Sequence, residues 1–124
     1  MRLGALVLLV ALSGGAAGAE VVSASGGVLR MLDKMTGVVS DHDLASGQSQ
    51  ALGRLTVTLD ACRYPADLPS GEAYAHLTIT DPDAALFAGW MIASSPALSA
   101  LDHPRYDVWV LRCVVPASTE GTGG

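Results

Sequence analysis

Residues 55–61 read LTVTLDA, and this stretch decides the fold. Apolar and polar side chains alternate along it, which is the period of two that a β-strand with one buried face requires. The alternation returns in residues 74–80, which read YAHLTIT, and apolar strands are expected at 86–93 and 106–115. Two short apolar runs around a turn predict a β-hairpin within residues 28–40.

The segments between these strands are short and rich in Gly, Pro, Ser and Asp, and no stretch has the period of a long helix. Parallel strands need crossover connections of about a dozen residues or more, so antiparallel pairing is predicted. The sequence therefore predicts an all-β domain of about six strands, either a small antiparallel sandwich or a partly closed barrel.

The N-terminus has the composition of a secretory signal peptide. Arg2 precedes an apolar run over residues 3–12, and residues 17–19, AGA, fit the small-x-small cleavage rule. Because a bilayer-spanning helix needs about 20 apolar residues, this run is too short to cross a membrane. We expect cleavage after Ala19 and export to the periplasm, which would leave no transmembrane segment. The alternative is an uncleaved N-terminal anchor.

The rest of the chain divides into a flexible lead-in at 20–27, a β domain at 28–115 and a disordered Ser/Thr/Gly tail at 116–124. The net charge is −5 at pH 7, and the basic residues form no cluster. Nucleic acids and anionic lipid surfaces attract basic patches, so neither is an expected partner.

The chain has two cysteines, Cys62 and Cys113. In an exported protein this even count favours one disulfide, and closing a loop of about 50 residues would stabilise the fold by about 4 kcal/mol. Two free thiols in a cytoplasmic protein are the alternative. A metal site is not favoured, because no CxxC pair is present and the histidines do not flank the cysteines at ligand spacing.

One detail conflicts with a regular strand at the first cysteine. Cys62 has the same phase as Thr58 and Asp60, which occupy the predicted outer face. Either a bulge or strand end lies near Ala61, or the disulfide lies at a sheet edge and not in the core.

Residues for catalysis are sparse. A small hydrolase could use Ser95 or Ser99 with His103, but a triad also needs an acid that orients the base, and no GxSxG motif is present. The acidic run 41–43, DHD, has no further ligand nearby in the sequence, so no metal or other cofactor is predicted. A non-enzymatic protein is favoured, with the small hydrolase as the alternative.

The aromatic and apolar block from Phe87 to Trp109 is the preferred interaction surface, with plain core packing as the alternative. Trp and Tyr dominate binding hot spots, and residues 94–101 carry no charge although surface loops usually do. The predicted partner-binding residues are Trp90, Ser94, Ser95, Pro96, Leu98, Leu101, His103, Pro104, Tyr106 and Trp109.

The same block carries a family resemblance. Residues 89–104 read GWMIASSPALSALDHP and residues 106–111 read YDVWVL, and shorter motifs lie at 29–37, LRMLDKMTG, and 61–63, ACR. These motifs resemble the bacterial "domain of unknown function" family 2155 over residues 28–113. The chain departs from the family at 64–67, YPAD, where members tend to have a more basic, Pro-rich segment.

The resemblance implies an exported protein of alphaproteobacterial type, with both cysteines as a family feature and without a known enzyme activity. It further implies an accessory role on inner-membrane respiratory assemblies. The sequence therefore predicts an exported, non-enzymatic binding or accessory protein that contacts a protein partner at the periplasmic face of the inner membrane.

Overall fold

The computed structural model describes Gly4 and residues 20–116. Apart from Gly4 and Pro116, the predicted signal peptide and the predicted tail lie outside the described residues. The described residues form strands and turns. No helix that is long and apolar enough to cross a membrane is found among them. They form the strands β1 Val21–Ser23, β2 Gly26–Asp33, β3 Val39–Ala45, β4 Ser49–Leu52, β5 Leu55–Pro65, β6 Tyr74–Thr80, β7 Ala85–Ile92, β8 Leu101–Asp102 and β9 Tyr106–Cys113.

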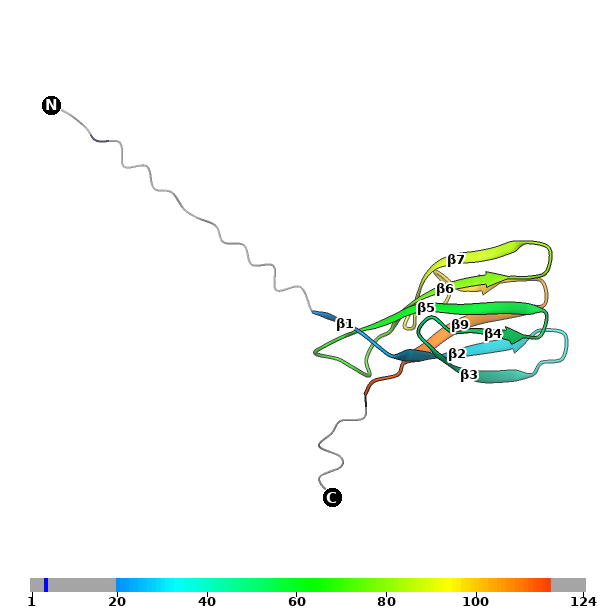
Figure 1. The fold of residues 1–124 in the computed structure, drawn as a ribbon, viewed down its shortest axis with the longest axis horizontal. Helices are drawn as coiled ribbons and strands as arrows, with labels where there is room; N and C mark the ends of the chain where they lie inside the picture. Colours follow the sequence, from blue (N-terminus) through cyan, green and yellow to red (C-terminus); the bar gives the residue numbers. More distant parts are fainter. Residues whose placement is uncertain (1–3, 5–19, 117–124) are drawn as a thin grey trace, which may run out of the picture.

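The strands form two antiparallel sheets that pack as a sandwich. The first, sheet A, has the order β1-β5-β6-β7, with β4 also paired to β5, and the second, sheet B, has the order β3-β2-β9-β8. In Figure 1, β5, β6 and β7 lie above β2 and β3. No described strand belongs to both sheets, which confirms the all-β antiparallel prediction and selects the sandwich over the barrel.

The described residues form nine strands, and the sequence predicted about six. The three strands that were not predicted are short. β1, β4 and β8 have 3, 4 and 2 residues. Such lengths are too short for a period of two to be recognised in the sequence. All three pair with a longer predicted strand, β5 or β9, and so owe their conformation to tertiary pairing.

The N-terminal segment corrects the prediction of a flexible lead-in at 20–27. β1 pairs with residues 63–65 of β5, and β2 already begins at Gly26. Between them, the Ala24 amide donates to the Cys62 carbonyl at 2.7 Å, and here the chain passes from sheet A to sheet B. Backbone pairing fixes this segment although its small side chains show no strand pattern.

The polar segment at 41–47 lies between the predicted hairpin and the predicted strand at 55–61, but most of it belongs to β3, an edge strand of sheet B. Its charged residues suit that position, because charges on an edge strand oppose pairing with another chain. Asp41 accepts hydrogen bonds from both Arg30 Nε and Arg30 Nη2, at 2.8 and 3.0 Å. The turn itself is limited to residues 46–48.

A β-bulge at Asp60 explains the phase of Cys62. Leu59 pairs with Leu77 and Ala61 pairs with His76, so Asp60 is the extra residue of β5. One inserted residue reverses the facing of all residues that follow in the strand. Cys62 therefore points into the core, which confirms the bulge that the sequence left open.

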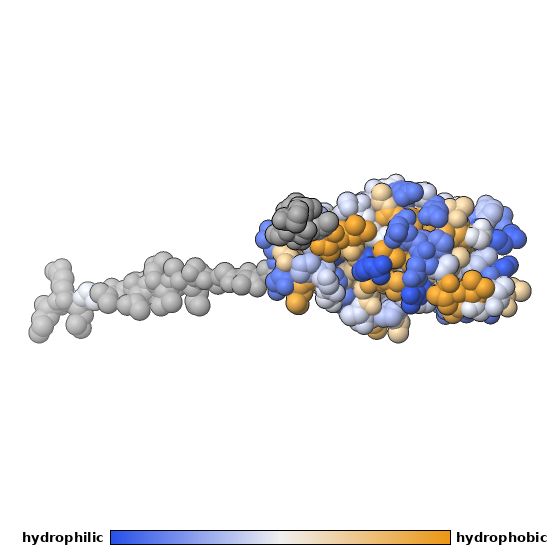
Figure 2. Space-filling view, turned by 90° about the horizontal axis from the view of Figure 1, so that it is seen from below, coloured by the Kyte–Doolittle hydropathy of each residue, from blue (hydrophilic) through white to orange (hydrophobic). Residues whose placement is uncertain are grey.

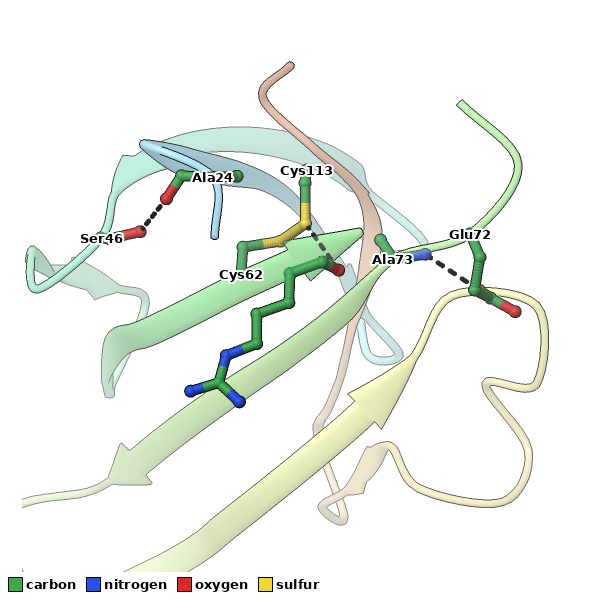
Figure 3. Close-up of a disulfide and its surroundings, with 7 residues drawn as sticks. Ala24, Ser46, Cys62, Glu72, Ala73 and Cys113 are labelled. Atoms are coloured by element: carbon green, nitrogen blue, oxygen red, sulfur yellow. Dashed lines mark hydrogen bonds between the residues drawn. A yellow bond between two sulfur atoms is a disulfide. The ribbon is translucent and has the colours of Figure 1, made fainter. Parts of the chain in front are cut away.

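The disulfide joins the two sheets. Cys62 on β5 is bonded to Cys113 at the end of β9 (Figure 3). Their Cα atoms are 5.7 Å apart, and both side chains are buried. Around the bridge, the inner faces of both sheets form one core of aliphatic side chains. Its largest fully buried members include Leu29, Leu44, Leu55, Leu59, Leu77, Ile79 and Met91.

Candidate functional site

The two tryptophans lie on the outer faces of different sheets. Trp90 on β7 is 41% exposed and pairs with His76 of β6 in sheet A. Trp109 on β9 is half-buried and pairs with Arg30 of β2 in sheet B. Because β7 and β9 belong to different sheets, the two tryptophan rings do not share one face of the sandwich.

Leu101 and Tyr106 were predicted to bind a partner, but both lie in the core. Leu101 is buried where β8 pairs with β9, and Tyr106 is only 3% exposed. The Tyr106 ring packs over Gly53, where a Cβ atom would lie 2.6 Å from the Tyr106 hydroxyl. Gly53 has φ 59° in the two-residue turn between β4 and β5, a conformation and a closeness that favour glycine.

The other predicted surface residues are accessible to different degrees. Leu98 is 81% exposed at the tip of the loop between β7 and β8. Ser94, Pro96 and Pro104 are exposed, and Ser95, His103 and Trp109 are half-buried. A groove of about 470 Å³ is lined by this loop and by Trp109, and Asp102 and Asp107 also line it.

The hydrogen bonds of this loop do not assemble a serine-hydrolase site. The Ser94 hydroxyl donates to Glu72, and the Ser99 hydroxyl donates to the carbonyl of Trp90. His103 Nδ1 accepts from the Arg105 amide at 3.1 Å, and its ring stacks on Tyr106. These polar groups fix the loop to its neighbours, and no described contact joins a serine hydroxyl to His103.

Glu72 holds the loop between β7 and β8 against the chain that precedes β6. Its carboxylate accepts hydrogen bonds from the amides of Ala73 and Ser94, each at 3.0 Å, and from the Ser94 hydroxyl. Partial burial raises the pKa of Glu72, but these hydrogen bonds outweigh it, so the pKa lies below its ordinary value of 4.5.

Replacing Glu72 with glutamine should make the protein less stable at pH 6 and remove part of its acid sensitivity. A carboxylate with a lowered pKa stabilises the fold above its ordinary value of 4.5, and that contribution disappears as the pH falls through the folded-state pKa. Denaturant unfolding of wild type and Glu72→Gln from about pH 6 to about pH 3 checks this. The stability gap should close in acid, and a gap that stays constant with pH would contradict the assignment.

A second surface, on the outer face of sheet A, was only partly predicted. The Arg63 guanidinium carbon lies 4.9 Å from the centroid of the Trp90 ring. The pocket around this pair has a volume of about 290 Å³ and is completed by Val21, Tyr74 and Ile92. We call these five residues the Arg63–Trp90 site. Sequence reasoning selected Trp90 and missed the other four.

The bulge at Asp60 supports this site from one side. The Asp60 carboxylate accepts hydrogen bonds from His76 Nδ1 and Thr78 Oγ1, each at 2.7 Å. The His76 ring in turn meets the Trp90 ring edge-on, with centroids 5.2 Å apart. Asp60 thus fixes His76, and His76 restricts the position of the indole.

Hydrophilic side chains separate the apolar patches on one face of the protein (Figure 2). On the face shown in Figure 2, several hydrophobic areas are divided by hydrophilic ones. Among the described residues, no group of three potential metal ligands lies close together.

Fold and surface together define a disulfide-closed β-sandwich domain with an exposed Arg–Trp pair on one sheet. The chain belongs to the family described as uncharacterized protein conserved in bacteria (DUF2155), whose model matches residues 27–113. This confirms the family predicted from the sequence motifs.

A curated relative is the "Uncharacterized protein RP359" of Rickettsia prowazekii (strain Madrid E). It is 31% identical over 100 residues, which cover 77% of this chain and 64% of the relative. The chain thus spans less than two thirds of that relative's length. No solved structure matches the chain.

Proposed function

We propose that the chain is an exported, non-enzymatic binding protein that docks as an accessory subunit on a protein assembly at the periplasmic face of the inner membrane. The observation that carries this proposal is the exposed Trp90 with Arg63 stacked on its ring. Large aromatic residues and arginine are the side chains most often found at binding hot spots.

Export is supported by the leader-like N-terminus and by the buried disulfide. Disulfides persist in the oxidising periplasm and are rare in the reducing cytoplasm. The inner-membrane assembly as target is what the family resemblance implies, and that resemblance rests in part on the motif at 89–104, which contains Trp90. No described contact favours the alternative hydrolase, because the loop hydroxyls bond to Glu72 and to the Trp90 carbonyl.

Replacing Trp90 with alanine should weaken partner binding about 30-fold or more, because truncating a hot-spot anchor typically costs 2 kcal/mol or more. The measurement is quantitative recovery of co-purifying proteins from native membranes, with the tagged chain at its natural expression level. Leu98→Ser is the matched control, since Leu98 is also exposed but lies in the loop between β7 and β8, outside the Arg63–Trp90 site.

We expect the wild type and Leu98→Ser to recover the same proteins, and Trp90→Ala to lose them. Equal recovery with all three proteins would exclude Trp90 as the anchor. Loss with Leu98→Ser alone would move the interface to the loop between β7 and β8. A chain recovered from the cytoplasm with Met1 retained would contradict export.

A further inference from the structure

Arg63 differs from the ion-paired basic residues of the protein. Arg30 pairs with Asp41 at 2.8 Å, Arg105 with Asp33 at 3.0 Å, and Lys34 with both Asp102 and Asp107. Within the described chain, the Arg63 side chain forms neither an ion pair nor a hydrogen bond, although the protein is acidic overall. The nearby Asp60 carboxylate is already used by His76 and Thr78.

The strand register holds Arg63 in place. Arg63 on β5 pairs with Tyr74 on β6, and Trp90 lies one strand further, opposite His76. The Arg63 side chain therefore crosses β6 to reach the indole ring at 4.9 Å. Stacking on an aromatic face orders the guanidinium and leaves the N–H groups at its edge free to donate. Less side-chain entropy is then lost when a ligand binds.

The surroundings of the guanidinium are apolar. Val21 is 49% exposed, and Tyr74 and Ile92 complete the pocket. A ligand seated here would exclude water from the guanidinium, and a charge-assisted hydrogen bond strengthens as the local dielectric falls. The site thus combines one planar cation with an apolar rim.

We propose that the Arg63–Trp90 site binds the carboxylate of an Asp or Glu side chain on the protein partner, with an aliphatic neighbour of that residue covering Val21 and Ile92. This proposal rests on the proposed function and adds the recognition chemistry. A planar carboxylate accepts two parallel hydrogen bonds from one guanidinium. A membrane densely covered with phosphates fits less well, because the net charge of −5 repels it.

The test uses a phage-displayed library of short random peptides as the probe and the purified disulfide-intact chain as bait. Peptides selected by the wild type should be enriched in Asp or Glu next to aliphatic residues, and Arg63→Gln should abolish that enrichment. Arg54→Gln is the matched control, since Arg54 is exposed in the turn between β4 and β5 and makes the same charge change. Equal unfolding temperatures of the three proteins show that the fold is kept.

The second arm of the test measures affinities. A selected peptide and its Glu→Gln version are each titrated against the wild type, Arg63→Gln and Arg54→Gln. Arg63→Gln should weaken binding of the acidic peptide about tenfold or more, since a hydrogen bond to a charged group contributes about 1.5–3 kcal/mol. The affinity for the Gln peptide should stay nearly unchanged. Peptides without acidic enrichment, or with enrichment that survives Arg63→Gln, would overturn this inference while binding itself stands. Selection of no peptide by the wild type would also overturn it. If neither the wild type nor either variant recovers any protein from native membranes, the proposed function itself is refuted.

Discussion

Replacing both cysteines with alanine should lower the free energy of unfolding by about 4 kcal/mol. Cys62 and Cys113 are 51 residues apart in sequence and join β5 of sheet A to β9 of sheet B. The bond restricts the conformations of the unfolded chain, and it joins the two sheets covalently through β5 and β9. Because small domains are marginally stable, the double variant should be partly unfolded at 37 °C.

Denaturant unfolding with and without reductant measures this effect. The wild type should unfold at a much lower denaturant concentration once reduced, and the double variant should not respond to reductant. The oxidised wild type should also be two hydrogens lighter in intact mass than the reduced wild type, whereas reductant should leave the mass of the double variant unchanged. Equal midpoints for reduced and oxidised wild type would show that the bond does not stabilise the fold.

Replacing Gly26 with alanine should destabilise the protein by about 3 kcal/mol, near the upper end of what overpacking usually costs. A Cβ atom at this position would lie 2.4 Å from the backbone carbonyl oxygen of Leu44. That atom belongs to β3, which pairs with β2 residue by residue, so it cannot move without disturbing the ladder. The close approach of the two strands here requires a residue without a side chain.

Gly89→Ala on β7 is the matched control for this substitution. The nearest atom to a Cβ there is Phe87 Cζ at 3.6 Å, an ordinary van der Waals contact. Alanine should be neutral or slightly stabilising at this position, because it restricts the unfolded chain more than glycine does. Similar unfolding free energies for the two variants would contradict the packing described for the start of β2.

The long strands could be predicted from sequence because their periodicity is local. Residues 55–59 and 74–80 alternate without interruption, and the structure places both in sheet A. The bulge at Asp60 could not be predicted with certainty, since an inserted residue leaves no signal except a change of phase. Here the apolar Cys62 in an outward phase was that signal, and it supported two readings until the register was known.

The candidate site was harder to predict than the fold. Trp90 stood out by residue type, but its contact with Arg63 depends on the order β5-β6-β7 and on the register of both pairings. Tyr106 was misplaced for a similar reason, because its burial depends on Gly53 in a distant hairpin. Side-chain type indicates what can bind, and tertiary register decides what is exposed.

The bulge at Asp60 connects stability with the proposed function. Without the inserted residue, Cys62 would face outward and Arg63 would face the core. With it, Cys62 reaches Cys113, and Arg63 lies on the outer face beside Trp90. The same inserted residue therefore closes the fold and presents the Arg63–Trp90 site.

The most direct test of the proposed binding role is site-specific photo-cross-linking in intact cells. A photoreactive benzoyl-phenylalanine is placed at the half-buried Tyr74, which lines the Arg63–Trp90 site, and at the exposed Val39 on the edge strand of the opposite sheet. We expect a discrete cross-linked membrane-associated protein from position 74 that is absent from position 39 and disappears when Trp90→Ala is added. No adduct at position 74, or the same adducts from both positions, would contradict the proposed binding role.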